Sequence, residues 1–126
     1  MILGLGTDIV EINRVRDALE KHGVAFAKQV LAPDELLLFE QRKNNPEFLA
    51  GRWAAKEAFA KALGTGIGKD CSFSGLTILP DEKNAPRFTA FAENTEKILF
   101  LKGIKHCHLS ISHERDYAVA TVILEG

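Results

Sequence analysis

The chain has few residues that could cross-link a fold. Only two of its 126 residues are cysteines, Cys71 and Cys107, and neither belongs to the paired Cys/His spacing of a zinc site. Two cysteines make no disulfide framework, so we expect free thiols in a reducing compartment. No apolar run approaches the length of a membrane-spanning helix. These absences exclude a disulfide scaffold, a zinc module and a helical membrane protein.

A dominant charge of one sign is also missing. The 16 basic and 17 acidic residues leave a formal charge of −1 at pH 7, so no overall field favours nucleic acid and any basic site must be a local patch. Residues 1–8 are largely apolar, but they have no basic lead and reach Asp8, which excludes a secretory signal peptide. We expect a cytoplasmic protein that binds neither nucleic acid nor membranes.

The pattern of hydrophobic residues predicts one α+β domain over residues 1–126, with a small antiparallel sheet packed with helices. Strands are expected over 2–12, 74–79, 86–89, 106–112 and 117–124. Helices are expected over 14–22, 33–42, 46–63 and 90–102. Asn13 is expected to cap the first helix. Residues 24–31 fit either a loop or a short helix.

The helix over 46–63 carries the most informative charges. Arg52, Lys56 and Lys61 surround a single carboxylate, Glu57, and a glycine-rich loop follows at once. Basic side chains and free backbone N–H groups suit a multiply charged anion, and the glutamate suits the metal that such an anion brings. The loop nevertheless follows the C-terminal end of a helix, whose dipole repels anions, so binding must come from loop N–H groups and cations.

These charges also have a purely structural interpretation. Glu57 and Lys61 are four residues apart and would form a surface ion pair contributing about 0.3–0.5 kcal/mol. Arg52 and Lys56 lie on a neighbouring face, where both would be solvated. The glycine loop has the spacing of neither a P-loop nor a dinucleotide-binding fingerprint, so it identifies no ligand by itself.

Two further residues lie within or directly after predicted strands. Asp8 follows an apolar run, where a carboxylate is costly unless it pairs locally or binds a metal. Mg²⁺ is commonly held by one or two carboxylates, waters and phosphates, so Asp8 and Glu57 together would suffice. His113 closes the strand over 106–112 and is either a structural histidine or one that reaches a ligand.

Three segments of the chain carry a family pattern. They are Gly4–Glu11 (GLGTDIVE), Phe48–Gly66 (FLAGRWAAKEAFAKALGTG) and His108–His113 (HLSISH) with Tyr117 and Ala118. Together they resemble the holo-acyl-carrier-protein synthase family, the short phosphopantetheinyl transferases. The middle segment is highly specific, and the resemblance spans essentially the whole chain.

This resemblance implies the phosphopantetheinyl transferase fold, assembled as a homotrimer with active sites between subunits. It implies a Mg²⁺-dependent enzyme of fatty acid biosynthesis. The enzyme would transfer the 4′-phosphopantetheine group from coenzyme A to a serine hydroxyl of apo-acyl carrier protein and release adenosine 3′,5′-bisphosphate. The implied partners are coenzyme A, the apo-carrier protein and further copies of the chain.

The resemblance also implies roles for single residues by position. The metal ligands would be Asp8 and Glu57. The catalytic residues would be Glu57, Lys61 and His113. The coenzyme A contacts would be Arg52, Lys61, Gly64, Thr65, Gly66 and His113. The carrier-protein contacts would be Arg14 and a second basic residue, for which Lys21 and Lys28 are candidates. The base that takes the serine proton is left open between Glu57, acting directly or through water, and His113.

The chain departs from the family at two turns. Ala32 stands before Pro33, where relatives usually have a hydroxyl residue that caps the helix, at an expected local cost of about 1 kcal/mol. Asn84 and Ala85 precede Pro86 without the glycine usually found there. Neither departure touches the metal or phosphate residues that the resemblance implies.

Two other functions are compatible with the same charged residues. A Mg²⁺-dependent pyrophosphohydrolase would use the two carboxylates on coenzyme A or another nucleotide, with no acceptor protein. A non-enzymatic coenzyme A-binding module would use the glycine loop for binding alone. Modification of an apo-carrier protein separates both from the transferase.

Overall fold

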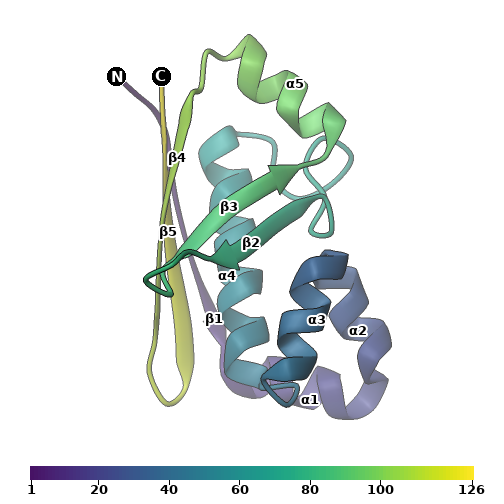
Figure 1. Ribbon diagram of the computed structural model, residues 1–126. Coiled ribbons are helices and arrows are strands. Elements are labelled where there is room, and N and C mark those ends of the chain that lie inside the picture. Colours follow the sequence, from purple (N-terminus) through teal and green to yellow (C-terminus); the bar gives the residue numbers. More distant parts are fainter.

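The computed structural model describes residues 1–126 as five strands and five helices (Figure 1). The strands are β1 (Ile2–Glu11), β2 (Leu76–Pro80), β3 (Pro86–Phe91), β4 (His106–His113) and β5 (Tyr117–Glu125). The helices are α1 (Ile12–His22), α2 (Val24–Val30), α3 (Pro33–Gln41), α4 (Pro46–Leu63) and α5 (Glu93–Leu101). One antiparallel sheet has the order β1-β5-β4, and β2 pairs with β3 in a second. The predicted α+β class is confirmed, with two small sheets in place of one.

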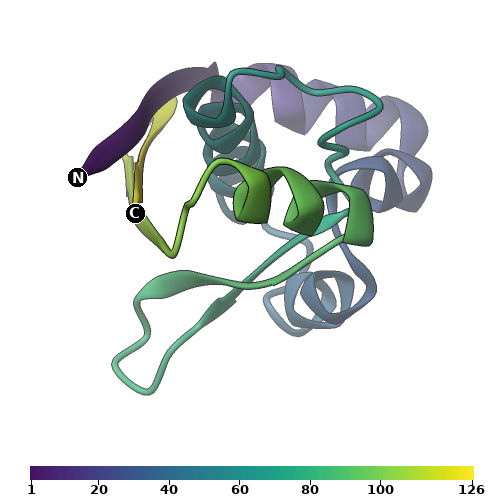
Figure 2. The same cartoon turned by 90° about the horizontal axis from the view of Figure 1, so that it is seen from above.

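The helix α4 packs on the inner face of the three-stranded sheet, between that sheet and α1–α3 (Figure 1, Figure 2). Side chains alternate along β5, and its inward residues are fully buried. They are Ala118, Ala120, Val122 and Leu124. On β1, Asp8 lies opposite Ala120 and therefore points toward the same inner face. None of the five helices has the length and hydrophobicity that a membrane span requires.

Two glycines bring β1 into direct backbone contact with α4. A β-carbon placed on Gly6 would lie 1.9 Å from the carbonyl oxygen of Ala58, and one on Gly4 would lie 2.2 Å from that of Ala62. No side chain fits at either distance, so only glycine permits this approach. Because inward residues alternate along a strand, Asp8 is the next inward residue after Gly6 and lies over the last turns of α4.

The predicted helix over 90–102 begins later, because Phe91 still belongs to β3. The ring of Phe91 stacks on that of Phe59 in α4, with the two ring centroids 5.4 Å apart. This packing against the central helix outweighs the local helical pattern, and α5 begins only at Glu93.

The predicted cap of the first helix is wrong. α1 begins at Ile12, with Glu11 at its N-cap position and no side chain that caps its N–H groups. The side-chain oxygen of Asn13 instead accepts a hydrogen bond from Arg16, within the first turns of the helix. Asn13 is therefore a helical residue and does not lie at the position of a cap.

Three uncertain segments have a simple local explanation. Residues 24–30 form α2, which confirms the short-helix alternative. At Ala32, Oε1 of Glu35 accepts a hydrogen bond from the backbone N–H at 2.8 Å, which supplies half of a capping box without a hydroxyl. In the β2–β3 turn, Asn84 itself adopts a left-handed conformation with φ of 65°, one that asparagine tolerates well.

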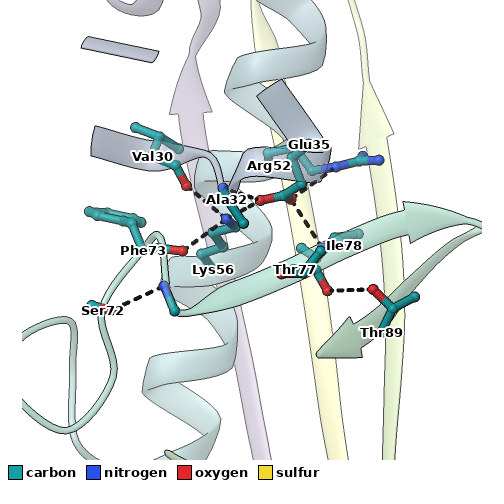
Figure 3. Close-up of polar contacts among 11 residues, drawn as sticks. Val30, Ala32, Glu35, Arg52, Lys56, Ser72, Phe73, Thr77, Ile78 and Thr89 are labelled. Atoms are coloured by element: carbon teal, nitrogen blue, oxygen red, sulfur yellow. Dashed lines mark hydrogen bonds and ion pairs between the residues drawn. The ribbon is translucent and has the colours of Figure 1, made fainter. Parts of the chain in front are cut away.

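A buried cluster of charges joins α3, α4 and β2 (Figure 3). Nζ of Lys56 lies 2.5 Å from Oε1 of Glu35, and both side chains are fully buried. Lys56 also donates to the carbonyl oxygens of Val30 and Phe73, at 2.7 and 2.9 Å. Oε2 of Glu35 accepts a hydrogen bond from the Ile78 N–H at 3.1 Å. The cluster therefore ties several separate segments to the central helix.

Arg52 joins this cluster at its edge. Its Nε atom lies 3.6 Å from Oε2 of Glu35, and its side chain is only 8% exposed. Burial lowers the pKa of Lys56 and lowers that of Arg52 to about 10, while Glu35 opposes both shifts. The interpretation of Arg52 and Lys56 as solvated charges is therefore wrong, because a single carboxylate accompanies both into the interior.

We predict that Gly6→Ala destabilises the protein by about 3 kcal/mol, because the added β-carbon has no room beside Ala58. Gly68→Ala is the matched control, since a β-carbon there meets no atom within 4 Å. Urea unfolding measures both variants. Equal unfolding midpoints for the two would contradict the direct contact between β1 and α4.

Lys56→Met should destabilise the protein by about 3–5 kcal/mol, because it leaves the carboxylate of Glu35 buried without its partner. Arg87→Met serves as the control. Arg87 pairs with Asp81 at 2.8 Å, but its side chain is 69% exposed, so little change is expected. Free energies of unfolding from denaturant titrations test this, and a Lys56→Met protein as stable as the parent would refute it.

Candidate active site

Asp8, Glu57 and Lys61 line one cavity of about 530 Å³. Nζ of Lys61 lies 2.9 Å from Oδ1 of Asp8 and donates to the carbonyl oxygen of Thr7 at 3.1 Å. The ion pair expected between Glu57 and Lys61 is replaced by this one, because the close approach of β1 brings Asp8 to the lysine. Three candidate residues, from two distant segments of the sequence, therefore face one space.

Glu57 is in an unfavourable position for a lone carboxylate. Burial raises its pKa above the ordinary value, the nearby Asp8 raises it further, and Lys61 opposes both effects. Ionised Glu57 is thus less favourable in this fold than in free solution. A cation held between the two carboxylates would remove that cost.

The pair suits Mg²⁺ better than a metal that requires a full set of protein ligands. No group of three or more histidine, cysteine or acidic residues is arranged to hold a metal in this fold, whereas zinc sites use three or four such ligands. Mg²⁺ needs only one or two carboxylates when waters and substrate phosphates complete its coordination. Asp8 and Glu57 would supply those carboxylates, and the open cavity leaves space for the other ligands.

The same cavity has an aromatic wall that was not predicted from the sequence. Phe26 and Trp53 line it, with ring centroids 5.6 Å apart. Trp53 also packs on Phe73, with centroids 4.9 Å apart. Trp53 precedes Glu57 by four residues and therefore shares its helix face. This spacing could have identified Trp53 from the sequence as a neighbour of Glu57 in the cavity.

The loop after α4 uses its N–H groups internally. Those of Gly64, Thr65 and Gly66 all donate to the carbonyl oxygen of Ala60, at 3.0, 3.2 and 3.2 Å. Gly64 and Gly66 have φ values of 89° and 66°, which explains why glycine occupies both positions. The prediction that this part of the loop offers free N–H groups is therefore wrong, and nearby cations are left to attract an anion.

Arg52 and His113 line a second cavity, of about 220 Å³, together with Arg42 and Glu47. Nε of Arg52 is buried without a hydrogen-bond partner, and its guanidinium carbon lies 4.4 Å from the ring centroid of Phe48. Two arginines and a histidine outweigh the single carboxylate in its lining, so the cavity suits an anion. No residue lines both cavities, so one chain does not bring all the candidate residues together.

Arg14 and Lys21, the candidate carrier-protein contacts, are both exposed on α1. They are seven residues apart, which is close to two turns, so they lie on one face of that helix. Arg14 also lines the cavity that contains Asp8 and Glu57. Exposed Asp17 lies between Arg14 and Lys21 on that face, so α1 presents two basic groups and one acidic group beside the carboxylate pair.

Comparison with known proteins identifies the same family as the sequence motifs. A family model described as the 4′-phosphopantetheinyl transferase superfamily matches residues 4–122. The holo-[acyl-carrier-protein] synthase of Vibrio parahaemolyticus is 49% identical over 125 residues, which cover 99% of this chain and 98% of that protein.

Solved structures extend the likeness to the fold. The holo-[acyl-carrier-protein] synthase from Neisseria meningitidis has a TM-score of 0.93 and 44% identity, and the match covers all of both chains. That of Helicobacter pylori, solved in complex with coenzyme A, has a TM-score of 0.84 and 34% identity over 96% of this chain and 99% of that one. Motifs, fold and likeness over the full length thus agree that the chain belongs to the 4′-phosphopantetheinyl transferase superfamily, among the holo-[acyl-carrier-protein] synthases.

Proposed function

We propose that this chain transfers the 4′-phosphopantetheine group of coenzyme A to a serine hydroxyl of apo-acyl carrier protein, with Mg²⁺, and releases adenosine 3′,5′-bisphosphate. The observation that carries the proposal is the convergence of Asp8, Glu57 and Lys61 on one cavity. The names of the relatives support the substrates, since they are holo-[acyl-carrier-protein] synthases and one was solved with coenzyme A.

The reaction is attack of a hydroxyl on a phosphoryl centre, which depends on positioning and on stabilising negative charge. Mg²⁺ held by Asp8 and Glu57 would supply charge neutralisation at the pyrophosphate of coenzyme A. Lys61, whose amino group already lies beside Asp8, offsets the charge that gathers on the leaving phosphate.

The serine proton requires a base, and Glu57 is our first choice. Its carboxylate lines the same cavity as Lys61 and would accept the proton there directly or through a water. His113 is the alternative, but in the same subunit it lies in the other cavity. It would therefore act from a neighbouring copy of the chain.

We further propose a homotrimer with active sites between subunits. The outer face of the three-stranded sheet exposes apolar side chains, among them Leu5 at 66% and Ile9 at 62%, with Val119 opposite Ile9 on β5. An exposed apolar face of this kind marks a protein contact. Packing copies along it would let the first cavity of one subunit meet the second cavity of the next.

The chemistry of coenzyme A supports a site made of two halves. Its pyrophosphate and its 3′-phosphate are separate anionic groups on opposite sides of a ribose. The cavity with Lys61 and the carboxylate pair suits the pyrophosphate with its metal, and the cavity with Arg52 and His113 suits a further phosphate.

The carrier protein would dock on α1, through Arg14 and Lys21. Carrier proteins are acidic, so charge complementarity would speed their association and weaken with salt. We place the reaction in the cytoplasm, because the free thiols of Cys71 and Cys107 suit a reducing compartment.

Incubation with coenzyme A, Mg²⁺ and apo-carrier protein should add the mass of one phosphopantetheine group to the carrier protein. Glu57→Gln should lower turnover at least about 100-fold. In the absence of Mg²⁺, the Glu57→Gln variant should also unfold at a higher temperature than the parent protein. The raised pKa means that ionisation of Glu57 opposes folding increasingly as pH rises through that pKa, and glutamine removes this cost.

The matched control is Glu82→Gln, at an exposed turn position, which should change neither property. Intact-protein mass spectrometry and thermal melting in chelator measure the two effects. Breakdown of coenzyme A without labelling of the carrier protein would indicate the hydrolase instead. Binding of coenzyme A with no turnover would indicate the binding module.

Mixing two impaired variants tests whether the site lies between subunits. Glu57→Gln and His113→Ala should each be poor enzymes at low coenzyme A concentration. Co-expressed in equal amounts, they should recover about one quarter of the parent activity, because about one interface in four then pairs an intact Glu57 with an intact His113. No recovery in the mixture would place both residues in a site of a single subunit.

A further inference from the structure

The last turn of α5 exposes two large apolar side chains. Thr95 and Leu99 of this helix are buried, whereas Phe100 is 83% exposed and Leu101 is 81% exposed. Single exposed apolar residues are common on protein surfaces, so exposure alone identifies no binding surface. Phe100 differs from such residues because it borders a hollow in the surface.

The hollow is a groove of about 420 Å³ between α5, β3 and the start of β4. Its charged lining is Glu96 from α5 and Lys105 just before β4. Neither of these two side chains forms an ion pair within the chain. The groove therefore combines one free charge of each sign with an apolar lining, which consists of Phe91, Leu99, Phe100, Ile104 and Cys107.

The groove lies away from the two protein contacts proposed above. Cys107 is opposite Leu124 in the sheet, and Leu124 is a buried inward residue, so the groove opens on the inner side of the sheet. The proposed trimer contact uses the outer side, at Leu5 and Ile9. The helix α5 also lies at the far end of the molecule from α1, where the carrier protein would dock (Figure 1). Neither proposed contact therefore covers the groove.

The groove is complementary to itself in shape and in charge. It offers a hollow beside a projecting Phe100, and Glu96 beside Lys105. In a two-fold contact the same patch of both subunits meets, so a feature of one copy faces its complement on the other. A purely apolar partner would leave both charges without a counterion, whereas a second copy supplies one for each. This favours a second copy as the occupant.

We infer that the groove is a two-fold contact between copies of this chain, with Phe100 as its principal apolar side chain. Phe100 of each copy enters the groove of the other, and Glu96 of each faces Lys105 of the other. One subunit can use this contact and the outer face of the sheet together, so the contact joins one trimer to another. A contact confined to one groove is small, and the association is therefore weak and concentration-dependent.

Sedimentation velocity of the full chain over a roughly 100-fold range of concentration tests the contact. The parent should form a heavier species whose share grows with concentration. Phe100→Ser should weaken this association at least about ten-fold and leave the smallest assembly intact, because a buried aromatic side chain carries much of the energy of a contact. Leu37→Ser is the matched control. Leu37 is 59% exposed and does not line the groove, so this variant should associate as the parent does.

Exchanging the two charges tests the two-fold arrangement. Glu96→Lys and Lys105→Glu should each weaken the association at least about five-fold, because like charges then face each other across the contact. The double variant restores opposite charges and should associate within about two-fold of the parent. A double variant as weak as the two single variants would overturn the proposed pairing.

Two other outcomes would overturn the inference. One is a parent chain with a single mass at every concentration. The other is a KM for the carrier protein that rises in Phe100→Ser while self-association stays unchanged, which would assign the groove to the carrier protein. The sedimentation measurements do not use turnover, so loss of the proposed transferase activity would leave this inference standing.

Discussion

The direct contact between β1 and α4 is the constraint on which the rest of the structure depends. Gly4 and Gly6 let the strand backbone reach carbonyl oxygens of the helix, at distances that exclude any side chain. This contact sets the position of Asp8 relative to Lys61, although the two residues are 53 positions apart in the sequence. The carboxylate pair with Glu57 exists because the strand lies this close, so packing of the core and chemistry of the cavity have one cause.

The helix α4 carries charged residues with two different roles on different faces. One face holds the fold together, and another faces the cavity. Lys56 is fully buried and makes three hydrogen bonds toward the interior, so it holds the fold together. Glu57 is the next residue and faces the open cavity, and Lys61 one turn further on keeps 53% of its side chain exposed. Arg52 stands between these roles, because it contacts buried Glu35 on one side and lines a cavity on the other. A rotation of 100° per residue suffices to divide one segment into a frame and a site.

Local patterns in the sequence predicted the order of the elements and the central helix, and the family resemblance implied that Asp8 and Glu57 act together. They failed where distant residues decide the outcome. Phe91 belongs to a strand because Phe59 packs on it, and no neighbouring residue carries that information. The N–H groups of the glycine loop were expected to be free, but their use by Ala60 depends on how the chain turns after the helix. The hydrogen bond from Lys102 to the carbonyl oxygen of Leu63 was not predicted either, since nothing near that lysine in the sequence indicates the contact.

Because side chains alternate along β1, the register between β1 and β5 decides whether Asp8 faces the cavity. Asp8 lies opposite Ala120, facing inward. A slip of one residue would turn the carboxylate to the outer surface and put a side chain where a glycine now touches the helix. Adding or deleting one residue ahead of this aspartate is therefore more harmful than most single replacements in the strand. Gly4 and Gly6 therefore allow only one register of β1 against β5 and α4.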